Sequence, residues 1–71
     1  MYKEIIKDKL KKAREDAGYT LEQVAIQIGT TQGTLSKYEN GKLEPGLETL
    51  CNLIDFYEVS ADWILGTGKK K

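Results

Sequence analysis

The chain has 71 residues, and its 11 basic and 11 acidic residues give it no net charge at neutral pH. This length allows one small domain, and no apolar stretch is long enough to cross a membrane. The opening residues lack the apolar region of a secretory signal. Histidine is absent and Cys51 is the only cysteine, so we expect no disulfide, metal or cofactor. These features predict a cytoplasmic protein.

The charge is unevenly distributed along the chain. Residues 1–14 carry a net charge of +4, residues 15–68 carry −7, and residues 69–71, all lysine, add +3. Charges act over a Debye length of ~10 Å, so a neutral chain can still present a local basic surface. The neutral total nevertheless counts against nucleic-acid binding, because DNA-binding domains are usually basic.

The first predicted helix covers about residues 2–17 and is ended by Gly18. Its apolar positions share one face and are expected to point into the core: Ile6, Leu10, Ala13 and Ala17. Arg14 lies on the border of this face, where a partly buried arginine requires a carboxylate partner. We expect that partner to be Glu39, with a surface arginine lying over Leu10 as the alternative.

A short second helix is predicted over about residues 21–28. Thr20 and Gln23 have the spacing of a capping box, in which each side chain accepts the other residue's backbone N–H. Gly29 follows the last apolar residue, at the position where a helix ends in a left-handed conformation. The chain is therefore expected to turn sharply at this glycine.

A third helix follows after a three-residue turn, with Thr31 as its N-cap and Asn40 and Gly41 at its end. So short a junction forces the two helices to cross steeply, which requires a small residue such as Ala25 at the crossing. Apolar residues must fill the space between them, and the candidates are Val24, Ile28, Leu35 and Tyr38. The pattern is typical of a helix-turn-helix within residues 21–40. A plain helical hairpin is the alternative.

Two more helices are predicted after the loop that contains the single proline. The fourth covers about residues 47–57, and its inner face is expected to hold Leu47, Leu50, Cys51, Ile54 and Tyr57. Cys51 would then be a core residue and not a nucleophile. Leu53 and Phe56 are expected to remain partly exposed. Ser60 caps a fifth helix over residues 61–65. The predicted fold is all-α, with one domain at residues 1–68 and a disordered lysine tail at residues 69–71.

With these elements placed, the chain resembles the helix-turn-helix domain of the lambdoid phage repressor and Cro family, also called the Xre-type family. The segments that carry the resemblance are GTTQGTLSKYENGK at residues 29–42 and VSADWILG at residues 59–66. The resemblance implies a compact five-helix, lambda-repressor-like fold. It also implies a transcriptional regulator, encoded by a bacterium or a phage, that binds operator DNA as a homodimer.

The resemblance assigns roles to residues in and around the third helix. It implies that the base-reading residues are Gln32, Gly33, Thr34, Ser36 and Lys37, with Gln32 suited to adenine and Lys37 to guanine or a phosphate. Gly33 can reach a base only through its backbone. The residues implied to contact phosphate are Thr31, Asn40 and Lys42. Leu21 departs from the family, which often has a polar residue there.

The resemblance also implies a dimer interface around the last two helices. Its residues would be Phe56, Tyr57, Glu58, Val59, Ala61, Trp63 and Ile64. A tryptophan in so small a domain is more often a core residue than an interface residue. Trp63 is therefore expected to belong to the core by about two to one.

Two function classes compete with DNA binding. The first is a protein-interaction module on the same fold, which the neutral net charge and Gly33 would suit. The second is an enzyme, which requires an activated nucleophile, an acid–base pair or a phosphate-binding loop. The sequence contains none of these patterns, so an enzyme is not expected.

Overall fold

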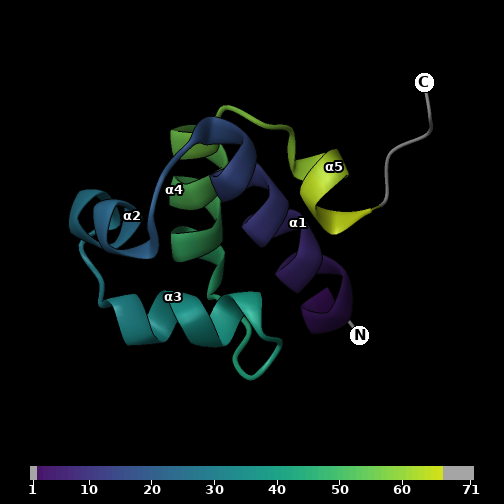
Figure 1. Ribbon diagram of the computed structural model, residues 1–71. Coiled ribbons are helices and arrows are strands. Elements are labelled where there is room, and N and C mark those ends of the chain that lie inside the picture. The colour runs from purple at the N-terminus through teal and green to yellow at the C-terminus, as the bar shows by residue number, and fades with distance from the viewer. Residues whose placement is uncertain (1, 67–71) are drawn as a thin grey trace.

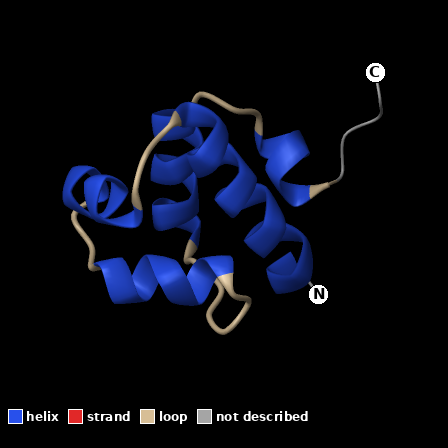
Figure 2. Cartoon of the chain, in the orientation of Figure 1, coloured by secondary structure: helices blue, strands red, loops and turns tan. Residues whose placement is uncertain are grey.

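The computed structural model describes residues 2–66, and the predicted lysine tail at residues 69–71 lies outside the described residues. Five helices follow one another in this part of the chain (Figure 1): α1 Tyr2–Ala17, α2 Leu21–Ile28, α3 Gln32–Glu39, α4 Leu47–Tyr57 and α5 Ala61–Leu65. Figure 2 shows only helices and connecting loops in residues 2–66. The predicted all-α, five-helix fold is therefore confirmed. No helix within these residues is long and apolar enough to span a membrane.

Side-chain caps begin three of the helices. Thr20 Oγ1 accepts the N–H of Gln23 at 3.1 Å, and Gln23 Oε1 accepts the N–H of Thr20 at 2.9 Å. Thr31 caps α3 and Ser60 caps α5 through the same kind of bond. Each such cap stabilises a helix by about 1 kcal/mol. The predicted capping box and both predicted N-caps are confirmed.

The turn between α2 and α3 depends on one glycine. Gly29 has φ of 84°, and the N–H groups of Gly29 and Thr30 both donate to the carbonyl oxygen of Ala25. Ala25 and Val24 are buried where the two helices meet. The sequence requirements of the helix-turn-helix are therefore satisfied together.

One core joins all five helices. Its members are Ile6, Leu10, Ala13, Val24, Ala25, Leu35, Tyr38, Leu50, Leu53, Tyr57 and Ile64. In Figure 1, α1 and α4 lie above α3, and α2 and α5 lie on opposite sides of the molecule. The core therefore holds α3 by one face and leaves its other face at the surface.

Four predictions about side-chain burial were wrong. Leu47 is 79% exposed and Cys51 is exposed, whereas Leu53 is only 1% exposed. The buried face of α4 is thus the one with Leu50, Leu53 and Tyr57. Helical spacing is compatible with either face, and packing against the other helices selects this one. Ala17 is exposed as well, because α1 ends there and the chain turns away.

Candidate nucleic-acid interface

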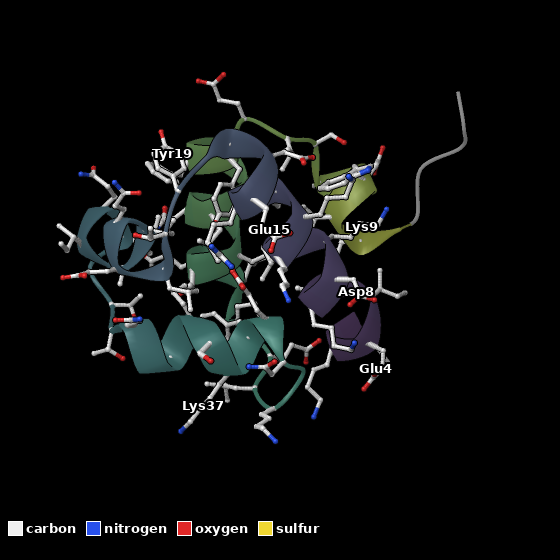
Figure 3. The ribbon with its side chains drawn as sticks, viewed as in Figure 1. Glu4, Asp8, Lys9, Glu15, Tyr19 and Lys37 are labelled. Atoms are coloured by element: carbon white, nitrogen blue, oxygen red, sulfur yellow. The ribbon has the colours of Figure 1, made fainter. Side chains whose placement is uncertain are left out.

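The outer face of α3 carries short and polar side chains. Leu35 and Tyr38 are buried and anchor the helix, while Gln32, Gly33 and Lys37 are exposed. In Figure 3, Lys37 projects away from the rest of the molecule. A Cβ atom at Gly33 would meet no atom within 4 Å, so the surface of α3 is open at this position. A helix of this kind can lie against another surface without obstruction from its own side chains.

An ion pair ties the end of α3 to α1. Arg14 Nε donates to Glu39 Oε2 at 2.9 Å and Arg14 Nη2 donates to Glu39 Oε1 at 3.1 Å. The third nitrogen, Nη1, donates to the carbonyl oxygen of Tyr19 at 2.9 Å. The pair expected from the sequence is therefore present, and it fixes α3 relative to α1 and to the loop before α2.

The ion pair also affects the pKa values of Arg14 and of the nearby Tyr57. The hydrogen bond to Glu39 raises the pKa of Arg14 above its ordinary value, although burial opposes this. Burial, together with the negative charge of Glu39, raises the pKa of Tyr57 to about 12. Tyr57 therefore remains neutral beside the ion pair until the pH is strongly alkaline.

The N-terminus of α3 is closed by two threonines. Thr31 Oγ1 accepts the N–H of Thr34 at 3.1 Å and donates to Thr34 Oγ1 at 2.8 Å. The hydroxyl hydrogen of Thr31 is thus already used in a hydrogen bond within the protein. A phosphate contact from this residue must use its backbone N–H or a rotated hydroxyl, and it stays a prediction.

The C-terminal end of α3 carries a second polar contact. Asn40 Nδ2 donates to the carbonyl oxygen of Ser36 at 2.8 Å and to Ser36 Oγ at 3.1 Å. Both residues lie on the open side of the helix, next to Gly33 and Lys37. The sequence reasoning missed this contact, although its i, i+4 spacing could have revealed it.

Basic residues approach α3 from α1 and from the following loop. Gly41 has φ of 74°, and a Cβ atom there would lie 2.8 Å from Cδ of Lys7. The side chain of Lys7 therefore extends from α1 to the loop that also carries the exposed Lys42, and its Nζ lies 3.2 Å from Asp8 Oδ1. The amino-terminal lysines were expected to lie mostly on solvated faces, and packing brings this particular one beside the end of α3.

The residues expected at a dimer interface fall into two groups. Ile64 and Tyr57 are 0% and 8% exposed, so other parts of the same chain already cover them. The remaining residues reach the surface at least partly: Phe56, Glu58, Val59, Ala61 and Trp63. Trp63 is half-buried against the core, and Lys9 Nζ lies 4.6 Å from its ring centroid.

The starts of α2 and α3 are the parts of this face that could bind an anion. Within residues 2–66, no group of three or more acidic, cysteine or histidine side chains could hold a metal ion. Leu21 opens α2 with an apolar, half-exposed side chain, so that position has no side-chain donor. The free backbone N–H groups at the start of α2 and α3 can donate hydrogen bonds to an anion such as phosphate.

The amino-acid sequence is similar to those of known proteins. A family described as helix-turn-helix matches residues 10–64. The chain is 40% identical over 58 residues to the HTH-type transcriptional regulator ImmR of Bacillus subtilis, covering 82% of this chain and 46% of ImmR. It is 41% identical to the SPbeta prophage-derived regulator YonR of the same species, covering 82% of this chain and 54% of YonR.

A third relative comes from a phage. The transcriptional repressor RstR of the cryptic phage CTXphi in Vibrio cholerae is 34% identical over 61 residues, covering 86% of this chain and 54% of RstR. The chain spans about half the length of the curated relatives it matches. These relatives are named as transcriptional regulators and not as enzymes. The chain belongs to the Xre-type helix-turn-helix family of DNA-binding transcriptional regulators.

Proposed function

We propose that this chain recognises operator DNA by placing α3 in the major groove, and that it acts as a homodimer in the bacterial cytoplasm to regulate transcription. One observation carries the proposal: α3 is anchored by Leu35, Tyr38 and the Arg14–Glu39 pair, and its outer face is free of obstruction. A helix held in this way can present side chains to base edges without moving.

The outer residues have separate proposed tasks. Gln32 opens α3 and can form paired hydrogen bonds with adenine, while Lys37 can donate to guanine or to a phosphate. Thr34 and Ser36 are further base-reading candidates. The proposed phosphate contacts come from Lys42, Asn40 and the N–H groups near Thr31, and they set the register of the protein on the duplex.

The test is selection from a random duplex library at low salt, followed by sequencing of the bound DNA. The expected result is two half-sites with two-fold symmetry, spaced by about one helical turn of ~10 bp. A single half-site would retain DNA reading but contradict dimeric binding. Uniformly weak binding without enrichment would contradict the proposed function as a whole.

Two variants separate base reading from phosphate binding. Gln32→Ala should reduce the free energy of binding to the selected operator by about 1–3 kcal/mol. It should also relax the base preference at one position of the operator. Lys42→Ala should weaken binding to all DNA sequences by the same factor. It should also lower the slope of log affinity against log salt concentration by about one. Lys12→Ala is the matched control, because this lysine pairs with Asp16 on its own helix at 3.5 Å. Lys12→Ala should leave both the base preference and the salt dependence of the affinity unchanged.

The proposed dimer uses the surface formed by Phe56, Glu58, Val59, Ala61 and Trp63. Ala61→Glu should disrupt it, because the new carboxylate suits the start of α5 but is unfavourable in an apolar interface. Ala17→Glu adds the same charge at an exposed position of α1 and serves as the control. Sedimentation equilibrium should show a shift toward monomer for the first variant only. An unchanged association constant would argue against this interface.

A protein-interaction module is the second candidate function. The observation in its favour is a shallow hollow between α2 and α4, lined by Tyr19, Gln23, Ile26, Gln27 and Phe56. Ile26 is 69% exposed at its edge. If the chain is an interaction module, its binding should depend little on salt and should show no DNA sequence preference. The library selection would then enrich no sequence.

A further inference from the structure

The shallow hollow between α2 and α4 is joined to a second one. The second hollow is lined by Gln27, Ile28, Asn52, Asp55 and Phe56, and two of these residues, Gln27 and Phe56, also line the first. The two hollows therefore form one continuous surface along the two helices, which we call the α2–α4 surface.

The middle of the α2–α4 surface is apolar. The rings of Tyr19 and Phe56 stack there, with their centroids 4.9 Å apart. Ile26 borders the first hollow and leaves 69% of its side chain exposed, so it contributes little burial to the fold. A partner that covered these side chains would remove apolar area from water, which favours binding.

The edges of the α2–α4 surface are acidic. Glu22 lies one turn before Ile26 on α2, Asp55 lines the second hollow on α4, and both acids are exposed. Residues 15–36 contain three acidic residues and no lysine or arginine, and residues 43–66 contain five acidic residues and no lysine or arginine. Negative charge without a basic neighbour on either helix repels phosphate and attracts cationic groups. The chemistry of this surface therefore suits a basic ligand and not DNA.

The α2–α4 surface also lies away from the outer face of α3. In Figure 3, Tyr19 and Lys37 lie on opposite sides of the molecule. A ligand that covers Tyr19 therefore leaves the exposed residues of α3 free.

A second copy of this chain matches the surface poorly. Its lysines are concentrated on α1, where Ile6, Leu10 and Ala13 are buried in the copy's own core. The copy can therefore offer positive charge but little apolar surface between the charges. A separate helix with an apolar stripe bordered by lysine or arginine offers both, and helices of this kind bind in apolar grooves.

We propose that the α2–α4 surface docks a basic amphipathic helix of another protein, on a side of the molecule separate from the DNA-binding face. Ile26, Tyr19 and Phe56 contact the apolar stripe of that helix. Glu22 and Asp55 pair with the cationic residues on its two borders. The docking itself is independent of the proposed function, and only its separation from the DNA-binding face rests on it.

The test uses a designed helical peptide of about 20 residues, long enough to form a helix by itself. The peptide has a leucine stripe bordered by lysines, and the control peptide has glutamate in place of each lysine. Nitrogen–proton NMR spectra of the full chain are recorded as each peptide is added. The lysine peptide should shift the backbone signals of Ile26, Gln27 and Asp55, and the glutamate peptide should shift none. Absence of binding by the lysine peptide, or shifts confined to other helices, would overturn the inference.

Three variants locate the binding. Ile26→Ser should weaken binding of the lysine peptide about 10-fold, through loss of an apolar anchor. Asp55→Lys should weaken it about 3- to 10-fold, because an attraction is replaced by a repulsion. The new lysine suits the end of α4, so the helix should be retained. Glu4→Lys makes the same change in charge far from Tyr19 in Figure 3 and should leave the affinity unchanged. Equal losses in the two lysine variants would mean that only the total charge attracts the peptide, which would also overturn the inference.

Two further outcomes concern other occupants of the surface. If the same NMR signals shift when the concentration of the chain alone is raised, a second copy occupies the surface and the inference is overturned. If Ile26→Ser or Asp55→Lys changes the base preference in the library selection, the surface is not separate from the DNA-binding face. If the wild-type chain enriches no DNA sequence, the proposed function has failed, and the peptide titration still decides the docking.

Discussion

Arg14 and Glu39 join the last turn of α1 to the last residue of α3 by two hydrogen bonds of 2.9 and 3.1 Å. Their side chains are only 14% and 8% exposed, so both charges are largely removed from water. Planar guanidinium and carboxylate groups that meet in this fork are among the stronger polar contacts in proteins. The position of α3 therefore depends on a polar contact as well as on the core.

Removing Arg14 should destabilise the domain. Arg14→Ala leaves the carboxylate of Glu39 largely buried without a partner, which we expect to lower the free energy of unfolding by about 3 kcal/mol. Lys12→Ala removes an exposed pair whose nitrogen and oxygen lie 3.5 Å apart, and it should cost no more than about 0.5 kcal/mol. Urea unfolding of both variants measures the difference. Equal losses would show that the Arg14 pair contributes no more than a surface pair.

Stability should fall at strongly alkaline pH because of Tyr57. Its pKa is raised from 10.0 to about 12 by burial, so the unfolded chain releases this proton first. The contribution is fully present below pH about 10 and is lost as the pH rises toward about 12. The raised pKa of Arg14 acts in the same direction.

Urea unfolding across this pH range tests the role of Tyr57. Tyr57→Phe should flatten the decline, because phenylalanine has no proton to lose. Tyr19→Phe changes an exposed tyrosine that stacks on Phe56, and it should keep the wild-type decline. A decline that survives in Tyr57→Phe would assign the pH dependence to another group.

Two leucines of α4 should differ sharply in their contribution to stability. Leu53 is 1% exposed, and Leu53→Ala should cost about 2–5 kcal/mol through lost burial and a cavity. Leu47 is 79% exposed, and Leu47→Ala should change stability by no more than about 0.5 kcal/mol. Thermal unfolding of the two variants compares them directly. A larger loss at Leu47 would mean that α4 buries its other face.

Two glycines, one within α3 and one just after it, should respond to alanine substitution in opposite directions. Gly33 is helical with open space around it, so Gly33→Ala should stabilise the fold by about 0.5–1 kcal/mol. It should also weaken operator binding if the bare backbone approaches a base. Gly41 has φ of 74° and lies under Lys7, so Gly41→Ala should cost about 1–2 kcal/mol.

Adding Lys7→Ala to Gly41→Ala separates the two causes of that cost. The double variant should recover the part that comes from the contact with Lys7 and keep the part that comes from the positive φ. Denaturant unfolding of the single and double variants gives the two contributions. No recovery would mean that the Lys7 side chain moves aside freely.

The sequence alone was sufficient for the helices and their ends. Capping by Thr20 and Gln23, and the left-handed turn at Gly29, involve groups that are close together in the chain, so local chemistry determines them. The ion pair between Arg14 and Glu39 was also predictable, because a partly buried arginine must find a carboxylate. The resemblance to the family follows from two short segments, at residues 29–42 and 59–66.

Only the tertiary structure decided which side of α4 is buried and which lysine of α1 lies beside the end of α3. Helical spacing is equally compatible with Leu47 or Leu53 inside, and the other helices cover the face with Leu53. Lys7 meets Gly41 because α1 packs against α3, which no local pattern encodes. Local hydrogen bonds determine where helices begin and end, whereas burial depends on what packs against each helix from elsewhere in the chain.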